Sequence, residues 1–68
     1  MNTNDKNLVI VNTTLQSMVE SLDRAEEALK EDKFRECESQ LKLYDLMYQS
    51  ANRNIQAYDR KNESFMVA

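Results

Sequence analysis

The chain contains no glycine and no proline in its 68 residues. These two residue types mark most turns and end most regular elements, so a chain without them has few places to change direction. Much of the remaining sequence consists of good helix formers such as Leu, Glu, Lys, Gln, Ala and Met. The sequence therefore predicts an all-α protein made of long helices.

Apolar residues recur in both halves of the chain with alternating steps of three and four positions. This heptad repeat is typical of a helix that packs along another helix. The first repeat consists of Leu8, Val11, Leu15, Met18, Leu22, Ala25 and Leu29. The second consists of Phe34, Cys37, Leu41, Tyr44, Tyr48, Ala51, Ile55 and Tyr58. We expect these two sets to form the contact between two helices.

The two repeats are out of phase with each other. Continuing the first repeat would place Asp32 and Glu36 in the core, where charged side chains are unfavourable. The step from Leu29 to Phe34 is five residues, which the heptad pattern does not supply. We interpret this break as a reversal of the chain.

The predicted fold is an antiparallel two-helix hairpin, with helix 1 at about residues 5–30 and helix 2 at about residues 33–64. We expect the Asp32 carboxylate to cap helix 2, and Asp also tolerates the left-handed conformation that ends many helices. A reversal at this residue pairs residue i with about residue 64−i, which gives apolar residues on both sides of every layer. Residues 1–68 then form one domain.

The segment AEEALKEDKFREC, residues 25–37, resembles the helix-turn-helix corner of tetratricopeptide-type and microtubule-trafficking-type hairpins. The chain has no 34-residue repeat of the tetratricopeptide kind, so the resemblance implies only the shape of the corner.

A hairpin of two helices leaves part of its apolar surface in contact with water. Small domains commonly gain stability by oligomerising, so we expect a homodimer that forms a four-helix bundle, or a helix of another protein, to cover this surface. Several apolar residues lie off the two repeats, or in the C-terminal segment that either frays or docks on the partner. The predicted partner-binding residues are Ile10, Leu43, Leu46, Met47, Phe65 and Met66.

Composition argues against catalysis and against metal or cofactor binding. Histidine is absent, so the commonest metal ligand and general base are both missing. Cys37 is the only cysteine and has no histidine or second thiol to activate it, so we interpret it as a buried small residue. We expect no enzymatic activity, no metal, no cofactor and no small-molecule substrate.

Charge and hydropathy bear on the partners and the compartment. Nine basic and twelve acidic residues give a net charge of −3, which gives no general attraction to nucleic acid or anionic lipid. The longest apolar run, residues 8–11, is too short for a signal peptide or a membrane span. A single cysteine cannot form an internal disulfide. We therefore expect a cytoplasmic protein that does not enter membranes.

Our first functional hypothesis is a small non-enzymatic protein-binding module that presents an apolar helix face to a partner protein. Such a module would act as an inhibitor, adaptor or co-chaperone, like many accessory factors of phages, plasmids and bacteria.

The alternative hypothesis is an RNA-binding dimer. The length, the mid-chain corner and the residues CES at 37–39 are similar to the Rop family of plasmid copy-number regulators. That resemblance implies a dimeric four-helix bundle that binds paired RNA loops. The acidic balance argues against it, and so does helix 1, whose only basic residues are Lys6, Arg24 and Lys30.

Overall fold

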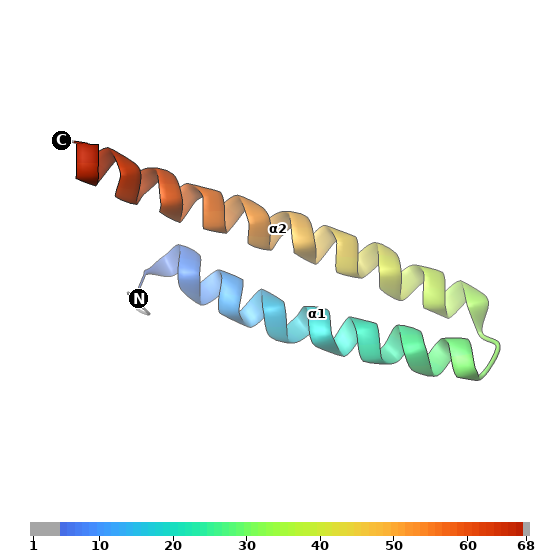
Figure 1. Cartoon of the computed structure of the whole chain (residues 1–68). Helices are drawn as coiled ribbons and strands as arrows, with labels where there is room; N and C mark the ends of the chain where they lie inside the picture. The colour runs from blue at the N-terminus through green and yellow to red at the C-terminus, as the bar shows by residue number, and fades with distance from the viewer. Residues whose placement is uncertain (1–4, 68) are drawn as a thin grey trace.

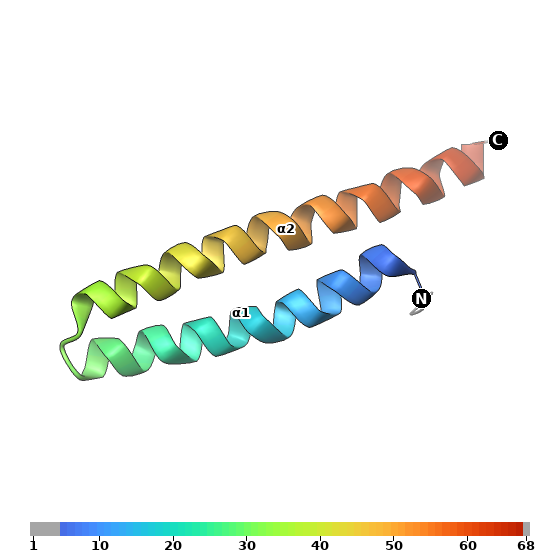
Figure 2. The same ribbon diagram turned by 180° about the vertical axis from the view of Figure 1, so that it is seen from behind.

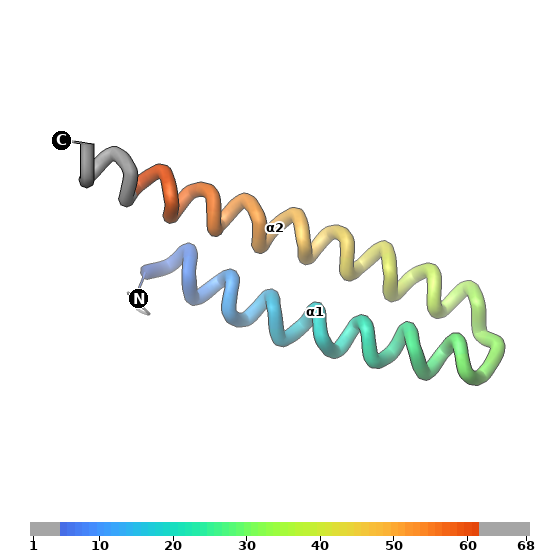
Figure 3. Tube along the Cα trace, viewed as in Figure 1, coloured from blue at the N-terminus to red at the C-terminus, as the bar shows by residue number. Residues whose placement is uncertain are grey.

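Figure 1 shows the computed structural model, which describes residues 5–67 and the side chains of residues 5–61 (Figure 3). Helix α1 spans Lys6–Lys30 and helix α2 spans Phe34–Val67. The helices pack side by side in opposite directions, with the turn at one end and both termini at the other (Figures 1 and 2). The predicted hairpin is confirmed, and α2 ends at Val67, later than the expected residue 64.

The reversal is a helix C-cap in which Asp32 takes the place usually held by glycine. Its φ of 59° lies in the left-handed region. The Asp32 N–H donates to the Leu29 carbonyl at 3.2 Å, and the Lys33 N–H donates to the Ala28 carbonyl at 2.8 Å. These two bonds form a Schellman motif, which satisfies carbonyls that the end of α1 would otherwise leave free. The predicted left-handed residue is therefore confirmed.

The predicted role of Asp32 as the cap of α2 is wrong. The Lys33 carbonyl accepts the first hydrogen bond of α2, from the Cys37 N–H at 3.0 Å, so Lys33 occupies the cap position. Asp32 lies one residue too early, because the C-cap of α1 has already used it. Within the described residues, its carboxylate forms no hydrogen bond with the start of α2.

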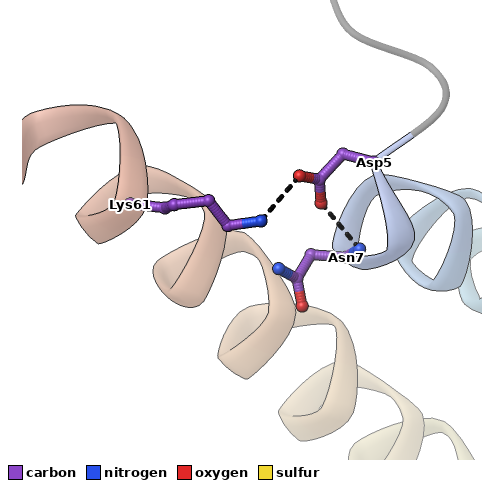
Figure 4. Close-up of polar contacts among 3 residues, drawn as sticks. All are labelled: Asp5, Asn7 and Lys61. Atoms are coloured by element: carbon purple, nitrogen blue, oxygen red, sulfur yellow. Dashed lines mark hydrogen bonds and ion pairs between the residues drawn. The ribbon is translucent and has the colours of Figure 1, made fainter. Parts of the chain in front are cut away.

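Asp5 caps α1 and also joins it to α2. Its carboxylate accepts hydrogen bonds from the Asn7 N–H at 2.8 Å and from the Lys61 ammonium group at 2.9 Å, as Figure 4 shows. Asp5 and Lys61 are 56 positions apart in the sequence, so this contact fixes the register of the two helices. Together with the turn at Asp32, it places residue i of α1 opposite about residue 65−i of α2, close to the predicted register.

The contact between the helices is a narrow seam of small and medium side chains. We define the seam as the least exposed residues, which recur at steps of three and four on both helices. They are Val11, Thr14, Met18, Ser21, Ala25 and Ala28 on α1, and Cys37, Gln40, Tyr44, Met47, Ala51, Asn54 and Tyr58 on α2. The small side chains of Ser21, Ala25 and Ala28 allow the backbones to approach closely.

The predicted seam is right for about half of its residues and wrong for the others. Val11, Met18 and Ala25 lie in the seam as expected, whereas Leu15, Leu22, Leu29, Phe34, Leu41, Tyr48 and Ile55 are exposed. In each case except Phe34, which the exposed Lys33 precedes, the seam takes the preceding position of the heptad instead. Neighbouring positions differ by about 100° around a helix. Because only one of the two apolar positions in each heptad is exchanged, the centre of the contact lies about 50° from the centre of the apolar stripe. On α1 mostly small residues face the other helix and the leucines point to one side, whereas the seam of α2 keeps larger residues such as Tyr44 and Met47.

Substitution of Asp32 tests the left-handed cap. We expect Asp32→Gly to raise the free energy of unfolding by about 0.5–1 kcal/mol and Asp32→Val to lower it by about 1–2 kcal/mol, because only glycine adopts positive φ without steric cost. Urea unfolding followed by circular dichroism measures both. Asp23, in the interior of α1, is the matched control, since glycine is worse than valine there. The same order of stability at both positions would contradict the assigned cap.

The pH dependence of stability tests the pair between Asp5 and Lys61. The hydrogen bond from Lys61 lowers the pKa of Asp5 below its ordinary value, against the opposing effect of burial. The pair therefore stabilises the fold above the unfolded pKa of about 3.9, and this contribution is lost as the pH falls through the lower folded pKa. We expect Asp5→Asn, which keeps a capping side chain, to be less stable than wild type at neutral pH.

We expect that difference, measured by urea unfolding, to disappear as the pH falls below the lowered folded pKa of Asp5, where both proteins lack the negative charge at residue 5. Asp23→Asn is the control, since Asp23 has no ion pair within the described residues. A difference of equal size at every pH would show that the charge of Asp5 is not involved.

Candidate protein-binding surfaces

The hairpin is one helix thick, so both of its broad faces are open to solvent. Its principal extents are 55 × 17 × 12 Å. Both helices are right-handed and they run in opposite directions, so residues that immediately follow a seam residue lie on the same face of the hairpin in both helices. Residues that immediately precede a seam residue lie on the other face. This relation assigns every exposed large apolar side chain except Val9 and Phe34 to one of the two faces, and Phe34 shares the face of Leu41, seven residues later.

One face carries a continuous row of large apolar side chains, which we call the leucine strip. It recurs every seven residues, as Leu8, Leu15, Leu22 and Leu29 on α1 and as Phe34, Leu41, Tyr48 and Ile55 on α2. All of them except the half-buried Leu8 are between 44% and 58% exposed. Val19, which follows the seam residue Met18, adds a further apolar side chain to the same face and is 59% exposed. An apolar surface of this length is typical of a protein-binding site.

The opposite face carries three of the predicted partner-binding residues. Ile10, Leu43 and Leu46 each precede a seam residue and are exposed, Leu46 to 62%. Leu43 and Leu46 lie close together on α2, and we call these two the outer patch. Ile10 is separated from them by about 12 residues of helix, or roughly 18 Å along the hairpin. The structure therefore places these three residues on one face but does not bring them into one cluster.

The other predicted partner-binding residues lie elsewhere. Met47 is half-buried in the seam, where it packs between the helices rather than on a free surface. Phe65 and Met66 belong to the segment whose side chains fall outside the described residues. The heptad pattern does not predict the leucine strip as a surface, because it places the same residues in the contact between the helices. The sequence does contain a signal for the true contact. The polar residues Thr14 and Ser21 alternate with core residues at heptad spacing, and in the structure they take the places expected for Leu15 and Leu22.

A groove near the turn is lined by both helices. Its volume is about 390 Å³, and its lining is mainly charged, with two arginines and three glutamates: Arg24, Glu27, Glu31, Arg35 and Glu36. Gln40 also lines it, and the side-chain oxygen of Gln40 is buried without a hydrogen-bond partner. The mixed charges give the groove no clear preference for an anion or a cation.

Cys37 and the surface charges complete the set of reactive groups. The Cys37 thiol is free and half-buried in the seam, in agreement with its predicted packing role. Lys30 donates a hydrogen bond to Glu26 at 3.0 Å on the exposed side of α1, and this bond raises the pKa of Lys30 above its ordinary value. Within the part of the chain that the structure describes, no three potential metal ligands cluster together.

Neither helix has, over its described residues, a stretch long and apolar enough to cross a lipid bilayer. Comparisons with protein-family models, with curated proteins and with solved structures found no match to this chain. The two broad faces of the hairpin are therefore the features of the described residues that bear on function.

A large side chain in the seam tests the close approach of the helices. We expect Ala28→Leu to lower the free energy of unfolding by about 1–3 kcal/mol, because the extra volume forces the backbones apart. This loss should occur although leucine is a good helix former and more apolar than alanine. Asp23→Leu, at an exposed position of the same helix, is the control and should change stability by less than about 0.5 kcal/mol. Thermal unfolding compares them, and a stabilised Ala28→Leu protein would contradict the tight seam.

Proposed function

We propose that this protein is a non-enzymatic helical module that acts by binding other polypeptides, and that its leucine strip is covered by two further helices in a four-helix bundle. A second copy of the chain, giving a homodimer, or a helical hairpin of another protein would supply these helices. The observation that carries the proposal is the leucine strip, which leaves seven large apolar side chains, each 44–58% exposed, outside the contact that the two helices make with each other.

The small core of the hairpin supports the proposal that other helices cover the leucine strip. Five apolar side chains are buried among the described residues, and three of them are alanines: Val11, Met18, Ala25, Ala28 and Ala51. Alanine removes little apolar area from water, so this core is weak for a chain of 68 residues. Domains of this size usually need a disulfide, a metal or another chain. With a single cysteine and no histidine, another chain is the remaining choice.

The direction of the leucine strip supports two further helices rather than one. In a four-helix bundle of square cross-section, the centre of the bundle lies at about 45° to the line that joins two neighbouring helices. The apolar stripe of each helix, which contains both seam and strip residues, is centred about 50° from that line. Both helices therefore point their stripes toward a common axis outside the hairpin, where a second pair of helices completes the core.

The outer patch then remains on the outside of the bundle. Leu43 and Leu46 are exposed there, and Ile10 lies on the same face toward the chain termini. We propose that a helix of a target protein lies along this face and reaches both places, in the manner of an inhibitor, adaptor or co-chaperone. A reducing cytoplasm suits the proposal, since it keeps the single cysteine free.

The placement of basic residues on α1 gives no support to the RNA-binding alternative. Arg24 precedes a seam residue, whereas Lys30 points away from α2 and is hydrogen-bonded to Glu26. Lys6 lies at the far end of the helix. These three positions form no row along the helix that would follow a phosphate backbone.

Charged substitutions in the leucine strip test the proposed function. We expect Leu22→Asp and Leu41→Asp together to weaken association by at least about a hundredfold. The variant loses the free energy gained by burying two leucines, and association would instead bury two carboxylates. Sedimentation measures the association, and circular dichroism measures the thermal unfolding that accompanies it. Leu43→Asp and Leu46→Asp together are the control, since they introduce the same two charges on the opposite face and should leave the bundle intact.

The wild-type protein should either become more stable with concentration, over about 2–200 µM, or remain a poorly folded monomer until its partner is added. A well-folded monomer with a concentration-independent melting temperature, unchanged by the double substitution in the leucine strip, would contradict the proposed function.

A further inference from the structure

We infer that the leucine strip is covered by a second copy of this chain, placed so that the two turns lie at opposite ends of the bundle and the two-fold axis passes beside Val19. This inference rests on the proposed function, in which two helices cover the strip. It adds the identity of those helices and their arrangement.

The area of the leucine strip suits a symmetric dimer. Seven half-exposed side chains, each with about 100 Å² still in contact with water, offer roughly 700 Å² per chain. A typical stable interface buries about 800 Å² per partner. The second copy also has the required shape, because it presents two antiparallel helices of the same length with stripes inclined at the same angle. The strip is therefore self-complementary, as a two-fold interface requires.

Two arrangements bring the strips of two copies face to face. If the two-fold axis runs parallel to the helices, both turns lie at the same end and α1 of one copy packs on α2 of the other. If the axis runs across the helices, the turns lie at opposite ends, and each helix packs on the same helix of the second copy. Neighbouring helices are antiparallel in both arrangements, so helix dipoles do not distinguish them. The charges along the two outer edges of the strip, one edge on each helix, do distinguish the two arrangements.

The edge on α1 is formed by residues that follow Val11, Met18 and Ala25 in the seam, namely Asn12, Val19 and Glu26. The edge on α2 is more acidic and is formed by Glu38, Asp45, Asn52 and Asp59. Apart from the bond of Glu26 with Lys30, no residue of these two edges belongs to an ion pair within the described chain. The edge on α2 thus carries three acidic residues without an ion pair among the described residues, whereas the single acid of the α1 edge is paired with Lys30.

Turns at the same end bring the α1 edge of each copy against the more acidic α2 edge of the other. The register of the hairpin pairs Glu26 of one copy with Glu38 of the other, and it places Val19 beside Asp45. Because of the two-fold symmetry, each of these contacts occurs twice. Like charges that face each other across an interface destabilise it, and a carboxylate beside Val19 loses hydration without gaining a partner.

Turns at opposite ends avoid most of these contacts. The middle of the strip on α1, between Leu15 and Leu22, lies at Val19, so the two copies of Val19 meet at the axis in an apolar contact. Glu26 then faces Asn12, and on the other edge Glu38 faces Asn52. The α2 edge faces its own copy in this arrangement, with Asp45 opposite Asp45 and Asp59 level with the turn of the second copy. The Asp45 carboxylate accepts a hydrogen bond from Gln49 at 3.1 Å. This arrangement also accounts for the high exposure of Val19 in the single chain.

The packing of the large side chains favours the same arrangement. Turns at opposite ends place Phe34 opposite Ile55 of the second copy, and Tyr48 opposite Leu41. Each aromatic ring then faces a smaller aliphatic side chain, as well-packed layers require. Turns at the same end would instead bring the two copies of Phe34 into one layer and the two copies of Tyr48 into another.

Cysteine cross-linking tests both the second copy and its orientation. All variants carry Cys37→Ala, so that the native thiol cannot react. We expect Val19→Cys to form a disulfide-linked dimer in more than about half of the chains under mild oxidation, because the two copies of residue 19 lie within the 7 Å or so that a disulfide requires. Gln16→Cys is the matched control on the exposed back of α1, and it should give less than about a tenth as much dimer.

The double variant with Asn12→Cys and Asn52→Cys reports the other orientation. These two positions lie on the outer edges of one hairpin, too far apart for an internal disulfide, and they meet between copies only when the turns lie at the same end. Cross-linking of this variant but not of Val19→Cys would overturn the inferred orientation. Equal cross-linking of Val19→Cys and Gln16→Cys would overturn the two-fold contact at Val19.

Sedimentation of the uncross-linked protein separates failure of this inference from failure of the proposed function. A wild-type chain that stays monomeric and poorly folded, with no cross-linking in any variant, would rule out the second copy and point to a hairpin of another protein. The proposed function would then still hold. A well-folded monomer that is indifferent to Leu22→Asp and Leu41→Asp would overturn both.

Discussion

The structure depends on an offset between where its two helices touch and where their large apolar side chains point. The helices meet through Ser21, Ala25 and Ala28 on one side and half-buried residues such as Cys37 and Tyr44 on the other. The leucines of the same stripes, with Phe34, Tyr48 and Ile55, lie on one face, so the centre of each stripe is about 50° away from the contact. A hairpin of this kind satisfies its backbone and its turn but leaves most of its hydrophobic surface unused. The need for a cover, the shape of that cover and the proposed binding function all follow from this offset.

The turn and the register make the leucine strip continuous. Asp32 allows a short reversal in a chain without glycine, because its left-handed backbone completes the cap of α1. The contact between Asp5 and Lys61 aligns the far ends of the helices. With the register held at both ends, Leu15 lies at the level of Tyr48, and Leu22 at the level of Leu41. A shift of one helix by a single residue would rotate its side chains by about 100° and break the strip.

The sequence predicts the hairpin, its turn and its register well, since these depend on the spacing of apolar residues and on the break between Leu29 and Phe34. It does not predict which side of each apolar stripe faces the other helix. Heptad spacing gives the direction of a stripe, but the number of helices that share the stripe decides where the contact falls. A pair packs through its smallest residues, and a bundle packs through the whole stripe. The contact between Asp5 and Lys61 was also beyond sequence reasoning, because it depends on the final register at the ends of the helices.

The most direct measurement of the central claim is an isotope-filtered nuclear Overhauser experiment on a sample that mixes labelled and unlabelled chains. It detects contacts between methyl groups of different polypeptides. The account predicts contacts between chains at Leu15, Leu22 and Leu41, and none at Leu46. A folded protein whose leucine strip shows only contacts within its own chain, with the same methyl groups open to a paramagnetic probe in water, would contradict it.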